Sequence, residues 1–305
     1  MKVALAFWGI TRSLSQTIDS IRTNIFTVLR ANGIEYTIFL HTYVVPSPFS
    51  NVRTKEQNCK LNPLEYTLLN ADYIALDDQD YVKKQLDLFK YRTHEDPWKT
   101  GYNSVDNYIC AMYSKKRVTQ LITESEILFD RIVFLRPDVR YLTPLCFEWL
   151  YSTMNNTITV PDFHLYTFMI NDRFSITNYE NGIRIGNLFD SMYDYSLQNP
   201  LHSETLLYTY VTETLHLRIV YIPLYFNRIR ANGFELRDAG TPKLTSPMRA
   251  SPMRASPLRA SPLRSPHVRQ PSARQPPPHR SPFVQKQISP NDINIVDIRT
   301  ITFNL

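Results

Sequence analysis

The apolar positions of the first 140 residues alternate between two spacings. A continuous apolar run, residues 3–10 (VALAFWGI), precedes a segment in which apolar side chains recur every three or four positions: Leu14, Ile18, Ile21, Ile25, Val28 and Leu29. Residues 34–43 (IEYTIFLHTY) are then rich in β-branched and aromatic residues. Because short apolar runs favour buried strands and the wider spacing favours amphipathic helices, this order predicts a strand–helix–strand unit.

The alternation continues through the centre of the chain. It predicts strands over residues 71–76 and 131–135 and helices over residues 77–89 and 103–122. The pattern after residue 150 is mixed, with strands over 157–163, 173–177 and 217–230 and helices near 180–197 and 203–215. We therefore predict one two-lobed α/β domain over residues 1–240, with a Rossmann-like, mixed and mostly parallel sheet flanked by helices.

The composition changes completely after residue 240. Residues 241–290 contain a five-residue repeat (SPMRA, SPLRA) and twelve of the 21 prolines of the chain. Such a segment has too little apolar surface to offset its chain entropy, which predicts a disordered or polyproline-like tail. Residues 291–305 regain β-propensity and predict a short strand-like segment.

The formal charge of +6 belongs to this tail. Residues 241–290 carry nine Lys or Arg and no Asp or Glu, whereas residues 1–240 carry 24 basic and 26 acidic side chains. A body so close to neutral does not indicate a nucleic-acid-binding surface, although the basic tail is suited to contact acidic surfaces. The three cysteines lie far apart, and we recognise neither a signal peptide nor a membrane span, which favours the cytoplasm.

Several familiar catalytic motifs are absent. Only Gly9 follows the first strand, so there is no GxGxxG, and neither GxxxxGK[ST], HExxH nor GxSxG occurs. These absences argue against an NAD(P) dehydrogenase, a P-loop ATPase, a zinc protease of that type and a serine hydrolase.

A polar step ends the strand predicted at residues 131–135. The apolar run stops at Arg136-Pro137-Asp138, where proline interrupts the ladder and leaves Arg136 and Asp138 near the carboxyl end of the strand. Ligands bind at that edge in open α/β sheets, so the pair is a candidate ligand site. The alternative is an ion pair that only stabilises the turn.

Four further polar clusters lie beside strand or helix ends. Thr11, Arg12 and Ser13 follow the first strand, where a helix N-terminus is suited to phosphate or is simply capped. Asp172 precedes a strand, and Glu204 lies at the start of a helix. Arg228 and Arg230 have the spacing that places them on one face of a strand, where they either bind an anion or are solvated.

The order of these segments resembles a known family. AFWGITRS, VFLRPDVRYL, NDRFSI, HSETLL and FNRIRANG together resemble the nucleotide-sugar glycosyltransferases of GT-A fold, over roughly residues 1–236. The resemblance is closest to those encoded by large DNA viruses and by bacterial capsule or lipopolysaccharide clusters. It implies a UDP- or GDP-sugar donor bound by residues 1–140, a glycan or protein-linked acceptor bound by residues 141–240, and, for a viral protein, the host cytoplasm.

The resemblance also implies roles for individual residues. Gly9, Thr11, Arg12, Ser13, Arg136, Arg228 and Arg230 are expected to bind the donor. Asp138 matches the last acid of a metal-binding DxD motif, but Arg136 replaces the first acid. Either Asp138 holds Mn²⁺ or Mg²⁺, or arginines neutralise the leaving diphosphate directly.

Catalysis leaves two further alternatives. An inverting transferase needs a general base, for which we favour Asp172 over Glu204, whereas a retaining one needs none. The chain is alternatively an inactive relative that serves as a binding or structural module, or another nucleotide-handling enzyme such as a nucleotidyltransferase.

Overall fold

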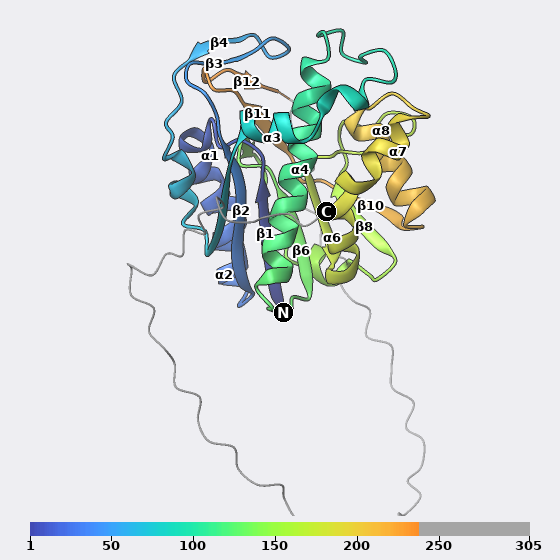
Figure 1. Ribbon diagram of the computed structural model, residues 1–305. Helices are drawn as coiled ribbons and strands as arrows, with labels where there is room; N and C mark the ends of the chain where they lie inside the picture. Colours follow the sequence, from blue (N-terminus) through green and yellow to red (C-terminus); the bar gives the residue numbers. More distant parts are fainter. Residues whose placement is uncertain (238–305) are drawn as a thin grey trace, which may run out of the picture. The chain divides into compact units, whose positions relative to one another are not determined.

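The computed structural model describes residues 1–237 and shows an α/β architecture (Figure 1). Seven strands form the central sheet in the order β10-β8-β9-β6-β1-β2-β5. Their bounds are β1 (Lys2–Trp8), β2 (Glu35–Val44), β5 (Tyr73–Asp78), β6 (Arg131–Leu135), β8 (Thr157–Pro161), β9 (Phe174–Asn178) and β10 (Arg218–Ile222). Neighbouring strands are parallel except at β9, which is antiparallel to β6 and β8. The predicted class, a mixed and mostly parallel sheet flanked by helices, is confirmed.

From Val3 to Trp8 the central strand β1 is apolar because both of its faces are covered. Phe7 packs into the core on the side of α1 (Leu14–Ile21), and Trp8 packs into the core on the side of α4 (Asn103–Glu124). Both side chains are at most 1% exposed. Burial on both faces therefore explains the uninterrupted apolar run in the sequence.

The predicted helices are present, several of them in shorter pieces. The helix after β1 is divided into α1, a π-helical turn at Arg22–Phe26 and α2 (Thr27–Ala31). The other α-helices are α3 (Gln79–Gln85), α5 (Glu148–Ser152), α6 (Tyr179–Gly186), α7 (Met192–Ser196) and α8 (Ser203–Thr209). Short 3₁₀ segments are Glu65–Leu69, Leu88–Tyr91 and Asn187–Ser191, and a π-helical turn at Tyr210–Thr214 continues α8.

Two small sheets lie beyond the central one. Strands β7 (Val139–Tyr141), β11 (Phe226–Ile229) and β12 (Glu235–Leu236) form an antiparallel sheet in the order β12-β11-β7. Pairing of β11 with β7 aligns Arg228 with Val139, next to the Arg136–Asp138 step. A hairpin of β3 (Phe49–Asn51) and β4 (Glu56–Cys59), which the sequence pattern does not predict, forms the other small sheet.

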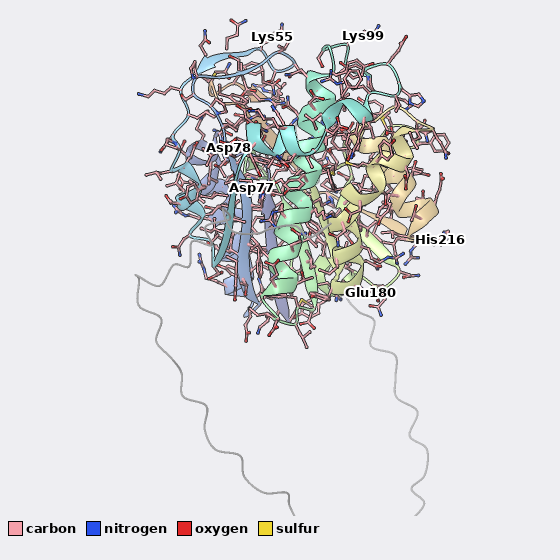
Figure 2. The ribbon with its side chains drawn as sticks, viewed as in Figure 1. Lys55, Asp77, Asp78, Lys99, Glu180 and His216 are labelled. Atoms are coloured by element: carbon pink, nitrogen blue, oxygen red, sulfur yellow. The ribbon has the colours of Figure 1, made fainter. Side chains whose placement is uncertain are left out.

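The polar segments at the strand ends share one edge of the central sheet. The parallel strands β1 and β6 end there, and antiparallel β9 begins there, because Leu135 pairs with Phe174. Asp172 and Arg173 therefore lie close to the end of β6. Figure 2 shows Lys55, in the turn of the β3–β4 hairpin, and Lys99, in the segment before α4, at this same end of the molecule.

The structure leaves the predicted tail untested. Residues 241–290 and 291–305 lie outside the described part of the chain, so the predicted disorder and the predicted strand remain predictions. None of the helices within residues 1–237 has the length and apolar character needed to cross a membrane.

Candidate functional site

An open cavity lies at the carboxyl edge of the sheet. Its most distinctive feature is six arginines from five segments of the chain: Arg12, Arg53, Arg136, Arg173, Arg228 and Arg230. Asp172 is the one carboxylate residue among those lining it. So many guanidinium groups around one cavity create a positive potential that suits an anionic ligand.

Asp138 lies behind two of these arginines. Arg136 donates from Nε to Oδ1 at 3.0 Å and from Nη2 to Oδ2 at 2.8 Å, which is a bidentate ion pair. Arg12 donates from Nη2 to Oδ2 at 3.3 Å. The Asp138 side chain is fully buried and does not line the cavity, so the carboxylate orients the two arginines that do.

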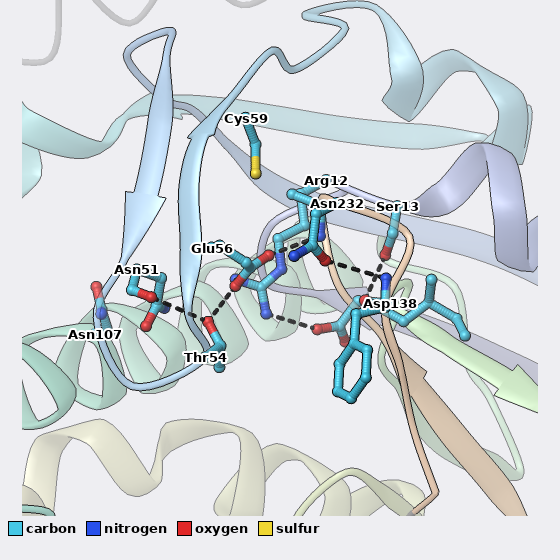
Figure 3. Close-up of polar contacts among 12 residues, drawn as sticks. Arg12, Ser13, Asn51, Thr54, Glu56, Cys59, Asn107, Asp138 and Asn232 are labelled. Carbon is cyan, nitrogen blue, oxygen red and sulfur yellow. Dashed lines mark hydrogen bonds and ion pairs between the residues drawn. The ribbon is translucent and has the colours of Figure 1, made fainter.

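Glu56, on the unpredicted hairpin, holds Arg12 from its other amino group. Oε2 of Glu56 accepts a bond from Arg12 Nη1 at 3.1 Å, and Oε1 accepts one from the Ala231 N–H at 2.6 Å. Thr54 donates to the same Oε2. Figure 3 shows Arg12 between Glu56 and Asp138, so one guanidinium joins the hairpin to the end of β6.

The residues around Asp138 do not fit the expected divalent metal ion. Mg²⁺ and Mn²⁺ need oxygen ligands with free lone pairs, and both oxygens of Asp138 already accept hydrogen bonds from guanidinium groups. Burial alone would raise the pKa of Asp138, but Arg136 and Arg12 outweigh it and lower the pKa to about 2. Within residues 1–237 no group of three His, Cys, Asp or Glu side chains is placed to hold a metal. Asp138 as a metal ligand stays a prediction, one that its present hydrogen bonds do not favour.

A second ion-pair network lies where β9 begins. Arg173 Nη1 lies 3.2 Å from Asp172 Oδ1, and Arg173 Nη2 donates to Glu204 Oε1 at 3.0 Å. Burial would raise the pKa of Asp172, but the guanidinium groups of Arg173 and Arg136 outweigh it, and the net shift is downward. Asp172 is thus held as a carboxylate that faces the cavity, whereas Glu204 does not line it.

The structure brings together six of the ten predicted site residues. Gly9, Arg12, Arg136, Asp172, Arg228 and Arg230 all line the cavity. Gly9 has a φ of +96°, a backbone conformation that residues with a Cβ rarely adopt, so the turn after β1 favours glycine at this position. Asp138 and Glu204 do not line the cavity but accept hydrogen bonds from the lining residues Arg136 and Arg173.

The other two predicted residues, Thr11 and Ser13, do not line this cavity. Thr11 lines a smaller neighbouring cavity, and Ser13 donates its hydroxyl hydrogen to the Ile229 carbonyl at 2.9 Å. The start of α1 is also occupied, because the Ser15 N–H donates to Glu65 Oε1 at 2.6 Å. A carboxylate of the chain itself thus binds at this helix N-terminus, and donor binding by Thr11 and Ser13 stays a prediction.

Several cavity residues escaped prediction. The guanidinium of Arg53 lies 4.7 Å from the Trp98 ring centroid, a cation–π contact between the hairpin and the segment before α4. On α4, the Ser104 hydroxyl and the Tyr108 hydroxyl are buried without a hydrogen-bond partner in the described chain. Neither the hairpin nor these positions of α4 carries a sequence signal that separates them from ordinary loop and core residues.

Lys115 lies one turn of α4 beyond the cavity residues Ala111 and Met112. It is 2% exposed, and its Nζ lies 4.3 Å from the Phe134 ring centroid and 5.6 Å from that of Trp8. Burial lowers the pKa of Lys115 to about 8. A buried amine with aromatic neighbours adds positive potential near the cavity when it is protonated.

A buried hydrogen-bond chain supports the backbone at Gly9. The Gly9 N–H donates to Ser114 Oγ at 2.8 Å, and Ser114 Oγ lies 2.7 Å from His41 Nδ1. His41 Nε2 lies 3.0 Å from Asp77 Oδ2. Burial lowers the pKa of His41 although Asp77 opposes the shift. Because Ser114 is fully buried, this Ser–His–Asp sequence positions the β1 loop and does not form an accessible nucleophile.

The fold and the site define an α/β protein with an arginine-lined cavity for an anionic ligand. Comparison with known families and with curated proteins finds no match for the chain. Among solved structures it is similar to mouse xyloside xylosyltransferase 1 in the apo form, with 12% identity and a TM-score of 0.36. The similarity covers 73% of this chain and 85% of that chain, and at this level it carries no inference about function.

Proposed function

We propose that this chain is a glycosyltransferase that takes a sugar from a UDP- or GDP-sugar donor and transfers it to a glycan or protein-linked acceptor. One observation carries the proposal: all five sequence segments that resemble such enzymes contribute a residue to the same cavity. In chain order these are Arg12, Arg136, Asp172, Ser203 and Arg228. Strand order brings the first three segments to one edge of the sheet, and the last two reach the same cavity from α8 and β11.

The chemistry of the cavity suits such a donor. A sugar nucleotide has a diphosphate, which guanidinium groups bind, and uncharged hydroxyl-rich parts, which neutral polar groups bind. The cavity offers both, because Ser104, Asn107 and Tyr108 line it on the side of α4. Residues 1–140 supply most of the lining, and residues 141–240 supply Asp172, Arg173, Ser203, Arg228 and Arg230, so both halves of the domain contribute to the cavity.

The arrangement assigns a role to the charged groups. Cleavage of the bond between the sugar and the diphosphate places negative charge on the leaving phosphate, and fixed guanidinium groups stabilise that charge without reorganising. Asp172 is the cavity carboxylate placed to accept the proton of an acceptor hydroxyl. Its lowered pKa keeps it ionised at neutral pH but makes it a weak base.

A panel of UDP-, GDP- and CMP-sugars tests the proposal. We expect one donor to raise the melting temperature of the full chain and to be hydrolysed slowly, with release of its nucleotide. Binding without any release of nucleotide, with or without acceptors, indicates the inactive binding module instead. If no sugar nucleotide shifts the melting temperature or is hydrolysed, the proposed function is wrong.

A further inference from the structure

Three arginines form a distinct group within the cavity. Arg12 and Arg136 are held by Asp138, and Arg230 immediately follows strand β11, whose Ile229 N–H donates to the Asp138 carbonyl at 2.9 Å. All three line the cavity. We name them the arginine triad.

The triad has more positive charge than its surroundings neutralise. Its partners are the two fully buried carboxylates of Asp138 and Glu56, which face three guanidinium groups. Arg230 has no ion pair with any residue of the described chain, and burial together with Arg12 lowers its pKa to about 9. A negatively charged ligand beside Arg230 would oppose this shift.

The triad also keeps donor capacity for a ligand. The Nε atoms of Arg12 and Arg230 are buried and have no hydrogen-bond partner among residues 1–237. Arg136 is one-fifth exposed, and its guanidinium lies 4.9 Å from the Trp8 ring centroid, which fixes its plane. Buried donors without acceptors are rare in proteins unless something outside the chain binds them.

We propose that the arginine triad of Arg12, Arg136 and Arg230 binds a diphosphate group directly, without a divalent metal ion, and that Asp138 is a positioning residue for it. As an assignment of the donor's diphosphate, the inference rests on the proposed function. In this arrangement the triad supplies the positive charge that a metal would otherwise supply. Asp138, the residue expected to hold the metal, instead holds Arg12 and Arg136. A cation brought to Asp138 has to displace these bonds and approach three guanidinium groups.

Calorimetric titration of the full chain with inorganic pyrophosphate and with UDP and GDP tests this. Each titration is run with a chelator and again with Mg²⁺ or Mn²⁺ at equal free ligand concentration. We expect pyrophosphate and one nucleotide to bind in the chelator, with affinities within about twofold of those measured with metal. Arg230→Gln should weaken both by about tenfold or more, with or without metal.

Two variants control for indirect effects. Arg131→Gln changes an arginine at the opposite end of β6, where Nε donates to the Leu150 carbonyl, and should leave both affinities within about twofold. Asp138→Asn should weaken binding equally with and without metal. If the Asp138→Asn protein does not fold, the titrations of Arg230→Gln alone test the inference.

The outcomes separate this inference from the proposed function. Nucleotide binding that needs metal and disappears in Asp138→Asn overturns the inference but leaves the transferase. Metal-free binding of pyrophosphate without binding of any nucleotide or sugar nucleotide supports the triad and contradicts the transferase. Absence of binding under every condition overturns both.

Discussion

Arg12 donates from Nη2 to Asp138 Oδ2 at 3.3 Å, although the two residues are 126 positions apart in the sequence. The contact joins the loop after β1 to the turn after β6, the two parallel strands at the centre of the sheet. Both oxygens of Asp138 accept bonds from guanidinium groups, so the carboxylate orients Arg12 and Arg136. Arg12 and Arg136 both line the cavity, so this pairing holds their positive charge there.

The stability of the protein should depend on pH through Asp138. The pKa of this group is lowered from 3.8 to about 2 in the folded chain, so its contribution is fully present above pH 4 and is lost as the pH falls toward 2. The contribution is on the order of 2 kcal/mol of unfolding free energy. Urea unfolding at several pH values between 5 and 2 measures this contribution, because the range spans the pKa of Asp138 in the unfolded and in the folded chain. Asp138→Asn should lack this component; an unchanged pH slope in that variant contradicts the ion pairs.

Substitutions of Asp172 and Glu204, the two carboxylates that pair with Arg173, should differ in their effect on sugar transfer. Asp172 lines the cavity, whereas Glu204 only binds Arg173 from behind. Asp172→Asn should therefore lower kcat by about 100-fold or more, because it removes the proton acceptor. Glu204→Gln, the matched change, should raise KM more than it lowers kcat. Equal losses of kcat in the two variants argue against Asp172 as the base.

Lys115 should destabilise the folded chain near neutral pH. Burial lowers its pKa from 10.5 to about 8, so the unfolded chain binds more protons between these values and stability rises with pH across that range. Lys115→Met should increase the unfolding free energy at pH 7 by on the order of 3 kcal/mol, and the gain should shrink as the pH approaches 10.

Lys116→Met provides the control for this prediction. Lys116 is the neighbouring residue, but its Nζ pairs with Asp190 at 2.6 Å and remains partly exposed. Its replacement should change stability little at any pH. A gain in stability for Lys115→Met that stays constant from pH 7 to pH 10 shows that the amine is not the cause.

Close packing of α6 on α4 gives a prediction about the scaffold alone. A Cβ added at Gly186 would lie 2.7 Å from Thr119 Cβ, too close for any side chain. Gly186→Ala should therefore lower the unfolding free energy by about 1–3 kcal/mol. Arg184→Ala, an exposed change on the same helix, should have little effect, and a stable Gly186→Ala protein means that the two helices separate more easily than the packing suggests.

The sequence predicts the scaffold because its signals are local. An uninterrupted apolar run marks strands such as β1, and a proline after Arg136 marks the end of β6. The topology rule for parallel strands then places Arg12, Arg136 and Asp172 near one edge, as the structure shows. These residues were predictable because strand order alone brings them together.

The rest of the site depends on contacts that no local pattern encodes. The hairpin that carries Arg53 and Glu56 has no regular hydrophobic spacing, so neither its strands nor its contact with Arg12 could be predicted. The contacts of Asp138 escaped prediction for a related reason. Sequence shows one acid at a motif position, but only the fold shows that Arg12 reaches it from the first strand.

A crystal structure of the chain with a bound sugar nucleotide would show directly which groups bind the diphosphate. We expect diphosphate oxygens within about 3 Å of the guanidinium nitrogens of Arg136 and Arg230, with the sugar next to Asp172. A ligand bound in the smaller cavity beside Thr11, or anywhere that leaves these arginines without a phosphate, contradicts this expectation.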